Sequence, residues 1–203
     1  MQEQDVIKVL KTDLNFSDSS INKLKLFSKN LILANQKYNF ISRSTELDIW
    51  QRHILDSAQL VKFIDFKSGS LSDLGSGAGF PGIVLAIFNK NVDFHVKLYE
   101  KSPVKRIFLK KMLEELDINA KVLTNVYDEV INSKTIVCRA FKKLDQVIQV
   151  SREIAEKPHK LIVLKGQNAQ EEINKAFKSQ KYPYKIEKSM SDKDSRIIII
   201  SFN

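Results

Sequence analysis

The stretch Asp73–Gly82, with the sequence DLGSGAGFPG, has glycine at four of its last eight positions. Glycine is costly in regular structure but allows tight turns and a close approach of the backbone to a ligand, so the cluster predicts a ligand-binding loop. The last three glycines satisfy the dinucleotide pattern G-x-G-x-x-G. The first three, which begin with Gly75 and Gly77, form G-x-G-x-G after the acidic Asp73. The type of cofactor therefore depends on where the next helix begins.

Pro81 lies between the last two glycines. Since proline is favoured in the first turn of a helix, we expect the helix to begin at Pro81 or Gly82. The preceding turn is then wide and lies against the strand end, so that Asp73 can reach into the cleft. A carboxylate there would repel a pyrophosphate and attract a sulfonium or ammonium group. The loop therefore favours S-adenosylmethionine, which is cationic and has no phosphate.

A second acidic residue supports an adenosine cofactor. Glu100 ends the next apolar run, VKLYE, 25 residues after Gly75. An acid at that strand end can hydrogen-bond the ribose hydroxyls of the cofactor. A nicotinamide dinucleotide would use the same acid, so Glu100 indicates adenosine without separating the two cofactors.

Basic residues lie near the ends of later strands and on two helices. Arg139 ends one predicted strand and can donate to the cofactor or to O6 of a guanine; the alternative is an ion pair with Asp73 or Glu100. Lys165, in LKGQ, ends the following strand on the same rim. The helix that carries RHILDS is expected to cover the cofactor pocket, with Asp56 orienting Arg52 or His53, and a packing role is the alternative for the histidine. The helix beginning KSPVKRIFLKK offers Lys105 and Arg106 to RNA phosphates, or simply to solvent.

The elements that must position these residues follow a clear pattern. The first 65 residues are predicted to be helical, with one helix around Ile21–Phe40 and a second over Glu46–Ile64, in which Leu47 faces the apolar side. From Ser70 onward, apolar runs alternate with amphipathic segments, which is typical of an α/β, Rossmann-like, mostly parallel sheet with helices on both faces. The two terminal runs predict that one strand is antiparallel. We expect a helical extension over residues 1–67 and a catalytic domain over residues 68–203.

Composition limits the class of protein. Lys and Arg number 33 and Asp and Glu number 24, a net charge of +9, which favours nucleic acid as a partner; general solubility is the alternative. A single cysteine excludes an internal disulfide and a cysteine-cluster metal site. No apolar run approaches the ~20 residues that span a bilayer. We expect a cytoplasmic protein with no metal and no membrane association.

Several separated motifs resemble one known family over nearly the whole chain. They are NQKYNFIS, RHILDS, DLGSGAGFPGIVLAI, KSPVKRIFL, CRAF and LKGQ. The chain resembles the glucose-inhibited division protein B family, bacterial methyltransferases that modify guanine N7 in small-subunit (16S) ribosomal RNA. The resemblance implies a seven-stranded methyltransferase fold with a helical N-terminal extension. It also implies S-adenosylmethionine as donor, S-adenosylhomocysteine as product, and ribosomal RNA or the 30S particle as substrate. We expect a monomer, since the enzyme must reach into a ribosomal particle.

The resemblance also assigns site residues by position. Cofactor contacts fall on Gly75, Phe80, Val126, Tyr127 and Arg139, with Glu100 near the ribose and Asp73 and Gly77 in the loop. From their charge and position, we expect RNA contacts at Arg52, Lys105, Arg106 and Lys165, and we expect Arg139 and Lys165 to position the reacting groups. The segment Asn125–Asp128 departs from the family pattern, which has an arginine in place of Asn125 and an acid in place of Tyr127. A methyltransferase with another target and a non-enzymatic assembly factor remain as alternatives.

Overall fold

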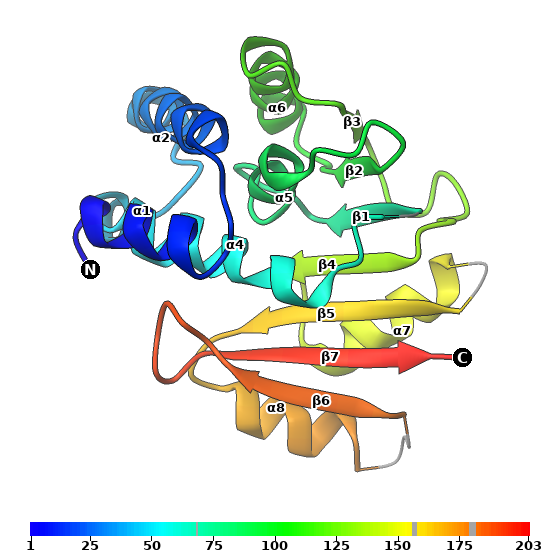
Figure 1. Ribbon diagram of the computed structural model, residues 1–203. Helices are drawn as coiled ribbons and strands as arrows, with labels where there is room; N and C mark the ends of the chain where they lie inside the picture. The colour runs from blue at the N-terminus through cyan, green and yellow to red at the C-terminus, as the bar shows by residue number, and fades with distance from the viewer. Residues whose placement is uncertain (68, 156–157, 179–181) are drawn as a thin grey trace.

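The computed structural model describes residues 1–67, 69–155, 158–178 and 182–203, and its centre is a seven-stranded sheet (Figure 1). The strand order is β3-β2-β1-β4-β5-β7-β6. Strands β1 to β5 are parallel, and β7 lies antiparallel between β5 and β6. The predicted fold class and the antiparallel insertion are confirmed. The strands are β1 (Ser70–Leu74), β2 (His95–Tyr99), β3 (Ala120–Leu123), β4 (Thr135–Arg139), β5 (His159–Lys165), β6 (Tyr184–Lys188) and β7 (Arg196–Phe202).

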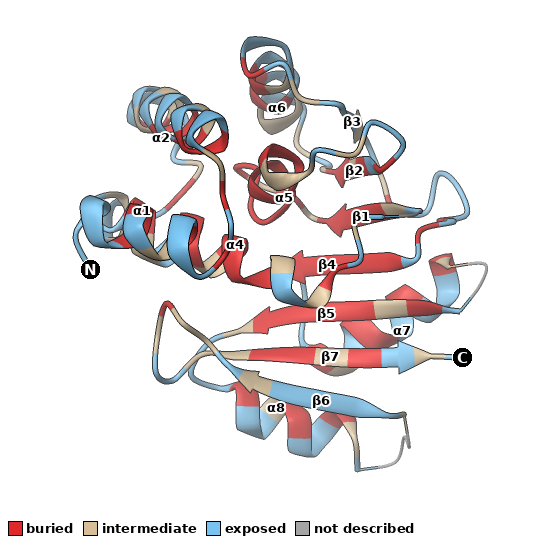
Figure 2. Ribbon diagram, viewed as in Figure 1, coloured by how far each residue is buried: buried red, intermediate tan, exposed pale blue. Residues whose placement is uncertain are grey.

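Helices cover both faces of the sheet, because successive residues of the central strands point to opposite sides. One apolar cluster joins α5 (Gly82–Phe88) and α6 (Pro103–Glu115) to residues such as Leu98 and Val137. The other joins α7 (Leu144–Ile154) and α8 (Ala169–Ala176) to alternate strand residues such as Tyr99 and Cys138. Figure 2 shows the central strands buried between these layers, while β6 is exposed at the sheet edge.

The N-terminal helices pack on the same core as the sheet. They are α1 (Glu3–Thr12), α2 (Asp18–Tyr38), α3 (Arg43–Glu46), the π-helical turn η1 (Trp50–Leu55), α4 (Asp56–Ala58) and the 3₁₀ turn η2 (Gln59–Phe63). Leu24 and Phe27 of α2 belong to the cluster that contains Leu98 of β2. The expected domain boundary falls on residue 68, which lies outside the described residues. Among the described helices, none is long and apolar enough to cross a bilayer.

The predicted helix over Glu46–Ile64 is confirmed in part: residues 50–63 are helical without a break, but the helix begins later than expected and its winding changes along its length. Helix α3 ends at Glu46, and the following segment is built from short π, α and 3₁₀ turns. Leu47, expected on the apolar side, is 95% exposed, because it lies in the connection between α3 and η1. The apolar period alone does not distinguish a continuous helix from a succession of differently wound turns.

The carboxyl ends of the parallel strands lie together at one edge of the sheet. Leu74 pairs with Tyr99 at the ends of β1 and β2, and Arg139 pairs with Leu164 at the ends of β4 and β5. In sheets of this kind, ligands bind beyond these ends, where the strand order reverses. The glycine loop follows β1, which is the strand at the centre of that reversal.

Candidate active site

A cavity of about 400 Å³, here called the glycine-loop cavity, opens beyond the ends of β1, β2 and β4. It brings together most of the residues predicted for the cofactor site, although they come from four separate segments. The lining includes Phe40, Ile41, His53, Gly75, Ser76, Gly77, Phe80, Tyr99, Glu100, Lys101, Lys105, Val126, Arg139, Ala140 and Phe141. The fold therefore forms a single concave site from groups that are distant in sequence.

The glycine turn forms the base of this cavity. Gly75 and Gly77 have φ angles of 72° and 57°, in the left-handed region that side chains disfavour. A Cβ added at Gly75 would lie 2.6 Å from Cδ2 of Phe141, so there is no room for a side chain. The amides of Gly75 and Ser76 both donate to the carbonyl of Tyr99, at 2.9 Å each, which holds the turn against β2.

Glu100 lies on the rim of the glycine-loop cavity, next to the glycine turn. Its carboxylate accepts the Gly77 amide at 2.8 Å and the Ser102 amide at 2.7 Å. These two bonds orient the side chain, and each oxygen keeps a second lone pair. The carboxylate can therefore accept hydroxyl groups from a ligand in the cavity.

Asp73 does not line the cavity, and the expectation that it reaches into the cleft is wrong. Its side chain is fully buried behind the loop, where Oδ2 accepts the Gly82 amide at 3.0 Å. Burial raises the pKa of Asp73 to about 7. Its other oxygen, Oδ1, has no hydrogen-bond partner among the described residues. Asp73 thus stabilises the start of α5 from below the loop.

The start of α5 leaves no place for a phosphate. The helix begins at Gly82, as predicted, and its first amide is already bonded to Asp73. A Cβ at Gly82 would lie 2.2 Å from Cδ2 of Leu98, so the helix packs directly on β2. A dinucleotide needs free amides at this helix end for its pyrophosphate. The glycine turn and the Glu100 carboxylate instead fit an adenosine cofactor that has no phosphate, and S-adenosylmethionine is such a cofactor.

Arg139 is held by the helical segment that follows Trp50. Its guanidinium donates to Nδ1 of His53 at 2.7 Å and to the carbonyl of Arg52 at 3.1 Å, and it forms an ion pair with Asp56 at 3.4 Å. It also lies over the ring of Phe80, 5.0 Å from the centroid. The expected alternative partners, Asp73 and Glu100, do not form the ion pair. Since the Arg139 side chain is only 19% exposed, its pairing with Asp56 offsets much of the cost of burial.

His53 is the residue whose place in the site was least evident from the sequence. An arginine can only donate, so Nδ1 of His53 is the acceptor, and Nε2–H donates to Oγ1 of Thr45 at 2.8 Å. The ring stacks on Phe80 with centroids 5.0 Å apart. Burial and the nearby Arg139 lower the pKa of His53 to about 3, so the imidazole is neutral. In the sequence, only its position next to Arg52 in RHILDS indicated that His53 could lie in the site.

A second cavity, of about 430 Å³, lies beside the first and is bordered by the β6–β7 loop; it is here called the hairpin-loop cavity. His53, Arg139 and Ala140 line both cavities and so form their common wall. Ala140 has a φ of 51°, a strained conformation for a residue with a side chain. The other lining residues include Thr45, Arg52, Asp56, Leu164, Lys165, Gly166, Glu172, Ser191, Asp192 and Ser195.

The predicted RNA-binding residues have different environments. Arg52 is exposed on the hairpin-loop cavity, and Lys105 lines the glycine-loop cavity. Lys165 forms an ion pair with Glu172 at 2.8 Å and donates to the carbonyl of Lys142 at 2.6 Å. Arg106 lies outside both cavities and donates to the carbonyls that follow β2, at Glu100 and Lys101. These bonds engage one guanidinium nitrogen, and the half-buried side chain stays a predicted contact for RNA phosphates.

Of the two adjacent residues assigned to the cofactor after β3, one lies in the site. Val126 is buried and lines the glycine-loop cavity. Tyr127 does not line it: the side chain is 53% exposed and its hydroxyl donates to Glu153 at 3.4 Å. Its side chain therefore lies away from the cavity, and a contact of its backbone with the cofactor stays a prediction. Among the described residues, no group of three or more His, Cys, Asp or Glu could hold a metal.

The sheet order and the glycine turn together define the class. The fold is that of Rossmann-like, S-adenosylmethionine-dependent methyltransferases. A solved methyltransferase of this kind from Aquifex aeolicus aligns with a TM-score of 0.59, covering 76% of this chain and 92% of that chain at 11% identity.

Sequence comparison places the chain more closely. The family described as rRNA small subunit methyltransferase G matches residues 20–198, and the chain belongs to that family. Ribosomal RNA small subunit methyltransferase G from Pelagibacter ubique is 34% identical over 92% of this chain and 90% of its own length. The protein of the same name from Rickettsia akari is 36% identical over 93% of this chain and 97% of its own length.

Proposed function

We propose that the protein transfers a methyl group from S-adenosylmethionine to N7 of a guanine in 16S ribosomal RNA and releases S-adenosylhomocysteine. The observation that carries this proposal is the pair of adjacent cavities with a common wall of His53, Arg139 and Ala140. The glycine-loop cavity suits the methyl donor, and the hairpin-loop cavity suits the acceptor base. Family membership supplies the substrate class.

When bound, S-adenosylmethionine supplies an electrophilic methyl group on a sulfonium. Guanine N7 attacks with a lone pair and carries no proton, so the protein needs no general base. The site agrees with this requirement, since the neutral His53 already uses its free nitrogen to accept from Arg139. The residues of the common wall would therefore act by holding the reactants in line and excluding water.

Arg139 is the donor best placed for the acceptor base. Its three protein contacts use three of its five N–H groups, which leaves two for a ligand. Guanine offers O6 next to N7, and an arginine is the side chain that matches this edge. Arg52 and Lys105 add positive charge around the two cavities for RNA phosphates. We further propose that the protein acts in the cytoplasm as a monomer on ribosomal RNA or the 30S particle.

The direct test uses the purified protein and 16S ribosomal RNA from a strain that lacks the corresponding gene. The RNA, naked or in 30S subunits, is incubated with methyl-labelled S-adenosylmethionine, and its nucleosides are separated by mass spectrometry. Labelled 7-methylguanosine is expected. Label in another nucleoside, or in none with either substrate, would contradict the proposal.

A paired variant tests the role of Arg139. Arg139→Ala should lower turnover by about 100-fold or more, since it removes a preorganised donor. It should also lower the free energy of unfolding by about 1–3 kcal/mol, because Asp56 loses its partner. Adding Asp56→Asn should restore stability, measured by urea unfolding, without restoring methyl transfer. Near-normal methylation by either variant would remove Arg139 from the site.

A further inference from the structure

Three carboxylates line the hairpin-loop cavity, and two of them are neutralised by protein cations. Asp56 pairs with Arg139, and Glu172 pairs with Lys165. The third is Asp192, and no described residue forms an ion pair with it within 4.0 Å. The cavity thus presents one carboxylate with no ion-pair partner among the described residues, although Arg52 is close enough to lower its pKa.

One oxygen of Asp192 anchors its own loop and the other is open. Oδ1 accepts the amides of Asp194 and Ser195, at 2.8 and 3.1 Å, and the Ser195 hydroxyl at 3.3 Å. Within the described residues, no hydrogen bond is made to Oδ2. The Asp194 amide is the main cause that lowers the pKa of Asp192, so the group is an ionised acceptor at neutral pH.

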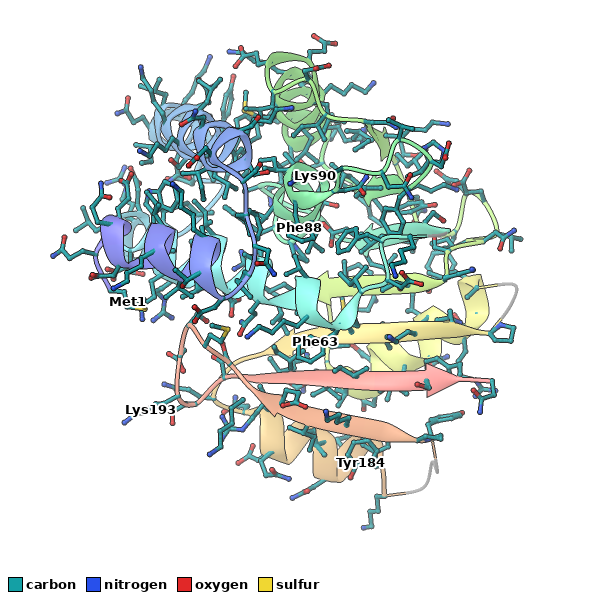
Figure 3. The ribbon with its side chains drawn as sticks, in the orientation of Figure 1. Met1, Phe63, Phe88, Lys90, Tyr184 and Lys193 are labelled. Atoms are coloured by element: carbon teal, nitrogen blue, oxygen red, sulfur yellow. The ribbon has the colours of Figure 1, made fainter. Side chains whose placement is uncertain are left out.

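The loop that carries Asp192 is held rigidly against the RHILDS segment, although the two are far apart in sequence. The Met190 amide donates to Gln59 Oε1 at 2.7 Å, and the Ser191 hydroxyl donates to Asp56 Oδ1 at 2.7 Å. Gln51 also donates to the Ser191 carbonyl at 2.8 Å. Figure 1 shows this loop on the side where β4 and β5 end, and Figure 3 labels Lys193 within it. A site on such a braced loop is preorganised.

Guanine differs from the other bases in a way that a carboxylate can detect. Its Watson–Crick edge carries two neighbouring donors, N1–H and the N2 amino group, and N7 lies on the opposite side of the purine. Adenine has no proton at N1. An ionised carboxylate is an acceptor with several lone pairs, and enzymes that act on an unstacked base read its Watson–Crick edge in this way.

We infer that the hairpin-loop cavity receives the acceptor guanine and that Asp192 determines its identity by accepting N1–H and the N2 amino group through Oδ2. This inference rests on the proposed function. In this arrangement, the two walls of the cavity contact different edges of the base. Asp192 reads one edge of the base, and Arg139, on the common wall, faces the edge that carries O6 and N7.

The test combines a protein variant with an altered base. The methylated guanine is first mapped in the wild-type product and then replaced by inosine, which keeps N1–H, O6 and N7 but lacks the N2 amino group. Wild-type kcat/KM should fall about 10-fold with inosine, because one charge-assisted hydrogen bond is lost. Asp192→Asn keeps the Oδ1 anchor but places an amide opposite the two donors. It should lower kcat/KM on guanine about 10- to 100-fold and make inosine and guanine nearly equal substrates.

Asp194→Asn is the matched control, since Asp194 is exposed on the same loop and does not line the cavity. It should keep the wild-type preference for guanine. The guanine-to-inosine ratio is measured within each variant, so a change in the folded fraction does not affect it. If Asp192→Asn retains the wild-type ratio, the assignment of Asp192 is overturned while the methyltransferase proposal stands. If the wild-type protein makes no 7-methylguanosine, both are overturned.

Discussion

At the scale of single residues, the protonation state of His53 decides whether Arg139 keeps its position. A protonated imidazole could not accept from the guanidinium, and it would add a third positive charge beside Arg139 and Arg52. It would also repel a sulfonium in the neighbouring cavity. The buried, neutral ring therefore serves both the protein fold and a cationic cofactor.

The depressed pKa of His53 predicts a specific dependence of stability on pH. The pKa is about 3 in the folded state and 6.5 as the ordinary value, so the unfolded chain binds a proton first on acidification. His53 should contribute full stability above pH 6.5 and lose it progressively toward pH 3, by up to about 1.4 kcal/mol per pH unit. His53→Gln should flatten this part of the pH profile of the free energy of unfolding.

The control for this measurement is His95→Gln, since His95 is exposed on β2. That variant should keep the wild-type slope. Asp73 has the opposite effect on stability. Its pKa is raised to about 7 in the folded state, so the folded state takes up the proton first and its free energy of unfolding rises as the pH falls. The difference between wild type and His53→Gln isolates the histidine. Parallel profiles for the two would show that His53 is not buried in neutral form.

At the scale of elements, the π-helical turn η1 explains how the RHILDS segment reaches the strand ends. Within the turn, the carbonyl of Arg52 accepts from Arg139, and the ring of His53 stacks on Phe80. Departures from α-helical winding of this kind are frequent at functional sites. The bond from the Ser57 hydroxyl to the carbonyl of His53, at 2.6 Å, holds the end of the turn.

The glycine turn after β1 gives a prediction at the same scale. Gly75→Ala should weaken binding of S-adenosylhomocysteine, because it adds a Cβ 2.6 Å from Phe141 and imposes a left-handed conformation that costs about 1–2 kcal/mol. A decrease in affinity of about 10-fold or more is expected by calorimetric titration. Gly166→Ala is the control, since nothing lies within 4 Å of its added Cβ. Equal affinities for the two variants would mean that the turn does not form the cofactor site.

At the scale of the whole molecule, the net charge of +9 favours RNA binding at the edge of the sheet where both cavities open. Arg52 is exposed there, and neutralised phosphates release counterions, so RNA binding should weaken with salt. Arg52→Gln should reduce the slope of log affinity against log salt by about 1, measured by filter binding to 16S ribosomal RNA. Lys67→Gln is the control. It removes the same single positive charge, but Lys67 precedes the start of β1, at the end of the strand away from the cavities, so the slope should stay unchanged. Equal slopes for Arg52→Gln and wild type would exclude a phosphate contact by Arg52.

Much of the fold could be predicted because its signals are local. The alternation of apolar runs and amphipathic segments reports burial along each element, and the glycines after β1 report a turn that only they can adopt. The mostly parallel sheet with one antiparallel strand is therefore confirmed, and α5 begins at Gly82, as expected. The start and the winding of the helical segment 46–64 were not predicted, since its apolar period does not encode the change from π to 3₁₀ winding.

The sequence by itself determined the sheet architecture, the glycine cradle, the acid at the end of β2 and the family. Only the tertiary structure decided that Asp73 lies beneath the loop, that Asp56 is the partner of Arg139, and that the loop carrying Asp192 borders the hairpin-loop cavity. The physical reason is the range of the interactions. Backbone propensities and burial act between neighbours, whereas the insertion of β7 between β5 and β6 brings Gln59 to Met190 across 131 residues of chain.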